Sequence, residues 1–130
     1  MIGLDTNVLV RYIAQDDPKQ SALATKLIDS LTKDNPGFIT VVTVVELVWV
    51  MQTCYQLTKL EVVNILNMLI ATKELMIENN ETVIKATKVF SLSKADFADC
   101  LIERLADKAG CKYSVTFDVG AIKHAGFKSL

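Results

Sequence analysis

Four acidic side chains lie in sequence contexts that suit chemistry better than simple solvation. Asp5 ends the apolar opening MIGLD, and Asp118 ends the run YSVTFD. Glu46 interrupts VVTVVELVWVM, and Asp99 has small or apolar neighbours in DFADCLIERLAD. A carboxylate at an apolar boundary needs a cation or a hydrogen-bond donor as its partner. No lysine or arginine in these motifs can serve all four acids, and carboxylate oxygens suit Mg²⁺ or Mn²⁺ rather than zinc or copper.

Carboxylates around a hard metal ion form an arrangement that cleaves phosphodiester bonds. The metal turns a bound water into a nucleophile and stabilises charge on the phosphate oxygens, and two metals roughly 3.5–4 Å apart clamp the attacking and leaving oxygens together. The chain has one histidine, His124, which argues against a serine or cysteine triad and against histidine-rich zinc chemistry. The residue types therefore favour catalysis by carboxylates and a divalent metal.

Each acid also has a simpler structural explanation. Asp5 can cap the helix that follows it. Thr43 and Glu46 have the spacing of a capping box, in which Glu46 accepts a hydrogen bond from the Thr43 amide. Asp96 and Asp99 share one helix face, which can be a solvated acidic stripe. The helix around Glu46 differs because it is apolar nearly all round, so we expect it to be buried in the core or covered by a partner.

Strand-like and helix-like segments alternate along the chain, which predicts a three-layer α/β/α sandwich with a mostly parallel central sheet. We expect strands at residues 2–4, 38–40, 75–77, 113–117 and 126–128. We expect a short helix after residue 5 and longer helices at about 18–31, 43–54, 58–72, 80–91 and 95–109. No linker or repeat divides the chain, so residues 1–130 are expected to form one domain. Ligands of such sheets bind beyond the carboxyl ends of the strands, where Asp5 and Asp118 lie.

Composition limits the classes of partner. The 130 residues carry 14 basic and 15 acidic side chains, so no global positive field attracts nucleic acid, and local geometry must do so. The longest apolar run is about half the length of a membrane span and contains Glu46, so no membrane partner is expected. Trp49, Val48 and Met51 are expected in the core or a dimer seam. The three cysteines lack zinc-ligand spacing and no secretion signal precedes them, which predicts reduced core thiols in a cytosol.

The motifs LDTNVLVRY, VVELVWVM, DFADCLIERLA and TFD, in this order and spacing, resemble the PIN-domain ribonucleases and above all the VapC-like toxins of prokaryotic toxin–antitoxin pairs. The resemblance extends from Met1 to the terminal GFKSL. It implies a cytoplasmic endoribonuclease that depends on Mg²⁺ or Mn²⁺ and cleaves tRNA, rRNA or mRNA. It also implies a homodimer, and a small antitoxin protein that inserts a segment into the active-site groove.

The resemblance also assigns residues. It implies that the catalytic, metal-binding acids are Asp5, Glu46, Asp99 and Asp118. Asp96 corresponds to a position that is often acidic in this subgroup and would help to hold a second metal or a water. Three more positions correspond to residues that support the acids: Thr6, Asn7 and Thr116.

Contacts to RNA are less clearly marked. Residues 119–121 read Val-Gly-Ala, where many relatives carry basic or polar residues, so the expected cationic contact at this point is in doubt. Lys123 and His124 follow shortly. His124 is explained either as a surface histidine or, with Lys123 and Lys128, as part of a modest phosphate-contacting rim. Arg11, four residues beyond Asn7, is equally well explained as a phosphate contact, an antitoxin contact or a surface arginine.

Two rival functions stay open at this stage. A receiver-like or phosphatase-like phosphoacceptor domain also carries an aspartate after its first strand. Asp5 is followed by Thr6 and Asn7 and by no second aspartate two residues on, which disfavours the phosphatase version. A non-catalytic interaction module would bind a metal or a basic partner through the same acids for structure only. Metal-dependent RNA cleavage by the purified protein separates that module from an enzyme.

Overall fold

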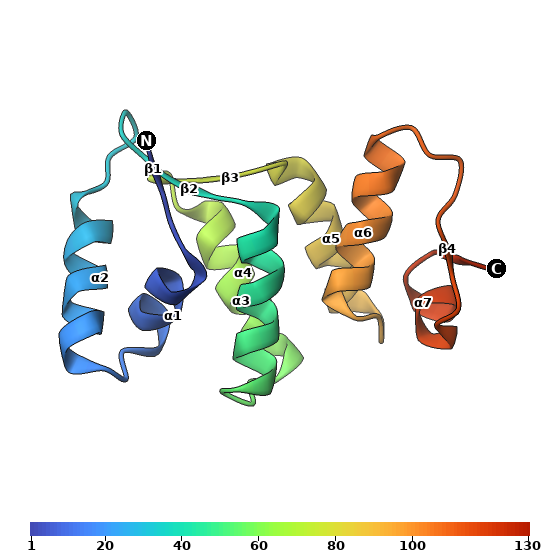
Figure 1. Ribbon diagram of the computed structural model, residues 1–130, viewed down its shortest axis with the longest axis horizontal. Coiled ribbons are helices and arrows are strands. Elements are labelled where there is room, and N and C mark those ends of the chain that lie inside the picture. Colours follow the sequence, from blue (N-terminus) through green and yellow to red (C-terminus); the bar gives the residue numbers. More distant parts are fainter. The chain divides into compact units, whose positions relative to one another are not determined.

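The computed structural model describes residues 1–130, which divide into two compact units, Met1–Glu78 and Asn79–Leu130 (Figure 1). The first unit contains β1 (Ile2–Gly3), α1 (Thr6–Ala14), α2 (Pro18–Ser30), β2 (Gly37–Ile39), α3 (Val41–Thr53), α4 (Lys59–Ala71) and β3 (Leu75–Ile77). The second contains α5 (Asn80–Leu92), α6 (Phe97–Lys108), β4 (Val115–Thr116), α7 (Val119–His124) and β5 (Lys128–Ser129). No helix has the length and apolar character that crossing a membrane requires.

The first unit is built on a parallel sheet with strand order β1-β2-β3. Gly37 of β2 pairs with Ile2 on one side and Leu75 on the other. A Cβ atom at Gly37 would lie 2.7 Å from Leu4 Cδ1 and 2.9 Å from Leu31 Cδ1, so a larger residue fits here only if these two side chains shift. Because β1 and β2 are parallel, α1 and α3 both begin at the same edge of the sheet.

Helices bury the apolar side chains of this unit. α1 packs against α2 and α3, and α4 packs against α3 and β3. Val48 and Met51 are buried as expected. Trp49 on the same helix is 59 % exposed, so it does not lie in the core, and the dimer seam, the other position expected for it, stays a prediction. Other fully buried side chains of the unit are Leu9, Ile39, Val44, Leu47, Leu66 and Leu69.

Polar caps fix where the helices of the first unit begin. Asp17 accepts a hydrogen bond from the Gln20 amide at 2.9 Å, and Pro18 lies in the first turn of α2. The capping box of Thr58 and Glu61 is also present.

The capping box expected at Thr43 and Glu46 is wrong. The cap of α3 is Thr40, whose hydroxyl accepts a hydrogen bond from the Thr43 amide at 3.2 Å. Since α3 begins at Val41, Thr43 already lies inside the first turn, and Glu46 is free to interact elsewhere.

In the second unit α5 packs against α6, as Figure 1 shows, and the rings of Phe90 and Phe97 meet edge to face with centroids 5.6 Å apart. β4 and β5 pair in parallel, and α7 packs against both. The strand expected at 113–117 is limited to 115–116, the edge strand lies at 128–129, and the short helix α7 was not expected. The α/β class with parallel strands is confirmed.

All three cysteines are free thiols, as predicted, but only Cys100 lies in the core. Cys54 and Cys111 are exposed, so the prediction of core positions is wrong for these two.

Candidate active site

Asp5 follows β1 and caps α1. Its Oδ2 atom accepts a hydrogen bond from the backbone amide of Asn7 at 3.3 Å, so the helix-cap explanation is confirmed. The side chain is exposed, and its Oδ1 atom makes no hydrogen bond within the protein. The cap fixes the orientation of the carboxylate and leaves one oxygen available to a cation.

Glu46 is exposed, so this side of its helix is not buried in the core, and cover by a partner, the other expectation, stays a prediction. One face of α3 is buried, while Val42, Glu46 and Trp49 lie on the open face. The hydroxyl of Thr6 donates a hydrogen bond to Oε1 of Glu46, and Thr6 itself is only 3 % exposed. This bond ties the first turn of α1 to the middle of α3 and holds the Glu46 carboxylate beside the helix start that Asp5 caps.

The second unit carries three of the predicted site acids, and each lies at the start of a helix. Asp96 caps α6, its Oδ1 accepting from the Ala98 amide at 3.2 Å, and Asp99 lies in the first turn. Asp118 caps α7, its Oδ1 accepting from the Ala121 amide at 3.1 Å. The Asp118 amide donates to the hydroxyl of Thr116 at 3.0 Å, which fixes the turn that presents this carboxylate.

The pKa of Asp99 shows how the acids of the second unit affect one another. Partial burial raises this pKa above its ordinary value of 3.8, and the negative charges of Asp96 and Asp118 raise it further. The three carboxylates are therefore close enough to repel one another. A divalent cation would favour the ionised form of Asp99 and relieve that repulsion.

The donor set fits a hard cation chemically, because the predicted ligands are carboxylates. Within either unit alone, no group of three or more histidine, cysteine, aspartate or glutamate side chains is arranged to hold a metal ion.

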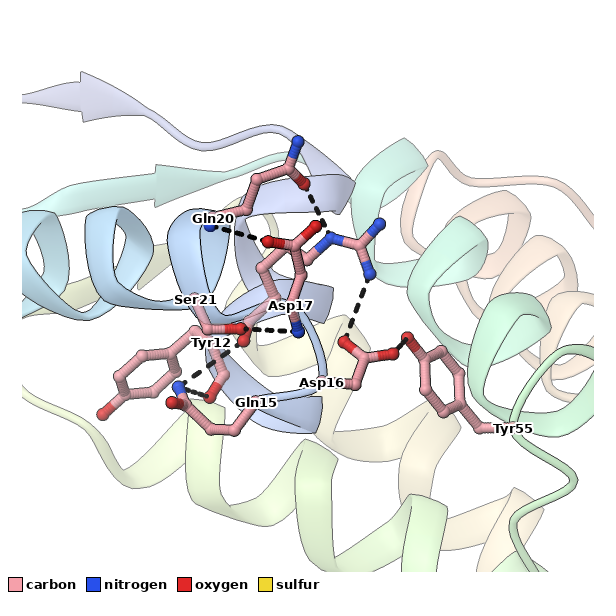
Figure 2. A network of polar contacts seen from close by, with 8 residues as sticks. Tyr12, Gln15, Asp16, Asp17, Gln20, Ser21 and Tyr55 are labelled. Carbon is pink, nitrogen blue, oxygen red and sulfur yellow. Dashed lines mark hydrogen bonds and ion pairs between the residues drawn. The ribbon is translucent and has the colours of Figure 1, made fainter.

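Arg11 belongs to a polar network that sequence reasoning missed (Figure 2). Its Nε atom donates to Oε1 of Gln20 at 2.8 Å, and its Nη1 atom forms an ion pair with Oδ1 of Asp16 at 3.2 Å. The hydroxyl of Tyr55 donates to Oδ2 of Asp16 at 2.6 Å. No local signal marks this set, because Tyr55 lies 39 residues from Asp16.

A groove of about 330 Å³ runs between α1 and α2 beside this network. Asn7, Arg11 and Gln20 supply its polar atoms. The remaining lining is apolar and comes from Val8, Leu23, Ala24 and Leu27. The groove therefore has a polar side that starts close to the cap of α1.

Lys123 and His124 lie in the last turn of α7. Positive side chains at a helix C-terminus interact favourably with the helix dipole, so these residues have a structural explanation besides RNA contact.

Comparison with known proteins covers nearly the whole chain. The family model of the PIN domain matches residues 2–128. A VapC ribonuclease of Aquifex aeolicus (strain VF5) is 24 % identical over 127 residues, which is 98 % of this chain and 93 % of that protein. The span matched by the family model contains every acid of the candidate site.

Proposed function

The chain belongs to the PIN domain family, and on this premise we propose that it is a metal-dependent endoribonuclease. The observation that carries the proposal is the grouping of Asp96, Asp99 and Asp118 at the starts of α6 and α7. Partial burial and then the charges of Asp96 and Asp118 raise the pKa of Asp99, and a divalent cation would relieve the repulsion among the three carboxylates. The printed name of the Aquifex aeolicus relative, a ribonuclease, supports RNA as the substrate.

In this proposal the metal ligands are Asp5, Glu46, Asp99 and Asp118, with Asp96 at a second metal or a water, and residues 1–130 act as one domain. Mg²⁺ or Mn²⁺, when bound, supplies an activated water and stabilises charge on the phosphate oxygens.

Hydrogen bonds within the chain hold three of the proposed metal-binding acids in place. Thr6 holds the Glu46 carboxylate, the Asn7 amide orients Asp5, and Thr116 fixes the turn before Asp118. Free amides at a helix start attract anions, so a phosphate group would fit at this end of α1.

We further propose that Arg11, Lys123 and His124 contact phosphates of the RNA strand. The protein would act in the cytoplasm as the toxin of a toxin–antitoxin pair, which is what the resemblance of its motifs to the VapC-like toxins implies. A homodimer and a small antitoxin are the proposed partners. The exposed apolar side chains of α3, Val42 at 71 % and Trp49 at 59 %, support a surface that a partner covers.

The test is cleavage of total cellular RNA by the purified protein in Mg²⁺, in Mn²⁺ and in EDTA, with the new ends mapped at nucleotide resolution. Cleavage is expected in one or both metals and not in EDTA, and Asp5→Asn should abolish it while the fold is kept. Full cleavage by Asp5→Asn would remove Asp5 from the mechanism. A stable covalent phosphate on Asp5 after incubation with acetyl phosphate would favour the phosphoacceptor function instead.

A further inference from the structure

The guanidinium of Arg11 is held from two sides by residues that no part of the proposed function uses. Gln20, on α2, accepts from Nε at 2.8 Å, and Asp16, in the α1–α2 loop, accepts from Nη1 at 3.2 Å. Tyr55, in the loop after α3, donates to the other oxygen of Asp16 at 2.6 Å (Figure 2). Three segments of the first unit thus converge on one arginine.

Asp16 is itself fixed by this arrangement. The hydroxyl of Tyr55 is the main cause of a lowered pKa at Asp16, so the carboxylate stays ionised at neutral pH. One carboxylate oxygen bonds to Tyr55 and the other to Arg11, which sets the plane of the carboxylate. Removal of the Tyr55 hydroxyl would therefore let Asp16 rotate and release Arg11.

The orientation of Arg11 matters because of where Arg11 lies on α1. Arg11 lines the α1–α2 groove together with Asn7, two residues after Asp5. Arg11 lies six positions after Asp5, which corresponds to a rise of about 9 Å along the helix axis. An RNA strand whose scissile phosphate lies at the start of α1 would place another of its phosphates, which is not cleaved, beside Arg11.

The guanidinium keeps donors for such a phosphate. Nε and Nη1 are engaged, while Nη2 makes no hydrogen bond in the structure. An arginine whose planar fork is oriented in advance loses less side-chain entropy when it binds an anion.

We propose that Tyr55 and Asp16 are positioning residues that orient the guanidinium of Arg11 toward a non-scissile phosphate of the RNA strand. The inference rests on the proposed function, because it takes RNA as the ligand. Tyr55 acts only through Arg11 and touches neither metal nor RNA. If the Tyr55–Asp16 hydrogen bond only joined two loops, its loss would affect RNA binding equally with and without Arg11. The two explanations therefore predict different results for the double variant.

The experiment measures binding of a short, mixed-sequence, fluorescent single-stranded RNA in EDTA over a range of salt concentrations. The variants are Arg11→Gln, Tyr55→Phe and the double variant. Tyr12→Phe is the matched control, because the Tyr12 hydroxyl makes no hydrogen bond in the structure. Melting temperatures of all variants identify losses that come from unfolding.

Arg11→Gln should weaken binding about tenfold and reduce the slope of log affinity against log salt by about one. Tyr55→Phe should weaken binding about threefold. The double variant should bind no more weakly than Arg11→Gln alone, because Tyr55 works through Arg11. Tyr12→Phe should bind like the wild type.

The inference is overturned if Tyr55→Phe or Arg11→Gln binds RNA as tightly as the wild type. It is also overturned if Tyr55→Phe weakens RNA binding as much in the Arg11→Gln background as it does in the wild type. The proposed function is judged separately by cleavage. If the variants bind RNA as expected but the protein cleaves no RNA, the nuclease function is rejected and the inference about Tyr55 and Asp16 is kept. If the protein cleaves RNA normally but Tyr55→Phe does not change binding, the nuclease function is kept and the inference is rejected. A wild type that binds no RNA would overturn the inference, while cleavage in Mg²⁺ or Mn²⁺ would still decide the proposed function.

Discussion

Replacing Thr6 by valine tests the hydrogen bond that joins α1 to the Glu46 carboxylate. Thr6 is 3 % exposed, and its hydroxyl donates to Glu46. Valine has nearly the same volume, so Thr6→Val removes the donor without opening a cavity. The substitution therefore separates the hydrogen bond from the packing of the side chain.

The size of the effect follows from the surroundings of the bond. A hydrogen bond to a charged group contributes about 1.5–3 kcal/mol. Glu46 is exposed and water can replace the lost donor, so we expect a loss of about 1 kcal/mol. For a chain of 130 residues, with an unfolding entropy of about 2.1 cal/mol/K per residue, this loss lowers the melting temperature by about 4 °C. Since Glu46 is then free to turn away, the cleavage rate should fall about 10- to 100-fold.

The matched control is Thr6→Ser, which keeps the hydroxyl and loses one buried methyl group. That loss costs about 0.8 kcal/mol, so the two variants should melt at similar temperatures. Thermal melting and the cleavage rate at saturating Mg²⁺ are the assays, and only Thr6→Val should lose activity. The reasoning is refuted if Thr6→Val cleaves at the wild-type rate, or if Thr6→Ser loses as much activity as Thr6→Val.

Two further substitutions test other parts of the structure. In metal-free buffer Asp99→Asn should raise the melting temperature at pH 7. The pKa of Asp99 lies above 3.8, so the folded state loses stability as pH rises through that raised value. The gain should vanish below about pH 3.8 in melts recorded across pH, and a gain that is the same at all pH values would contradict this cause. Gly37→Ala would place a Cβ atom 2.7 Å from Leu4 and should cost about 1–3 kcal/mol in urea unfolding, whereas unchanged stability would show that Leu4 and Leu31 can move aside.

Local patterns in the sequence were enough to predict most elements. The third strand lies at residues 75–77 as expected, and α5 at 80–92 matches the helix expected at 80–91. The spacing of apolar residues and the residue types that cap helices are local signals, which is why the cap at Asp5 could be predicted as well. Asp118 also caps a helix, but α7 has six residues, too few for a periodic pattern to show.

The failures involve information that is not local. α3 is apolar nearly all round, so its sequence could not indicate that the side with Glu46 and Trp49 is open. The partner of Glu46 is Thr6, 40 residues away, and the capping-box spacing pointed to a nearer but wrong partner. The bond between Tyr55 and Asp16 likewise depends on how two loops meet.

We propose that Asp5, Glu46, Asp99 and Asp118 hold the same divalent ion, and calorimetric titration with Mn²⁺ is the sharpest test of this proposal. Wild type, Asp5→Asn and Asp99→Asn are compared, and the RNA cleavage of each is measured in parallel. We predict that either substitution weakens the same Mn²⁺ binding step by about tenfold or more and lowers cleavage with it. Wild-type Mn²⁺ affinity in both variants, or undiminished cleavage in EDTA, would contradict the claim.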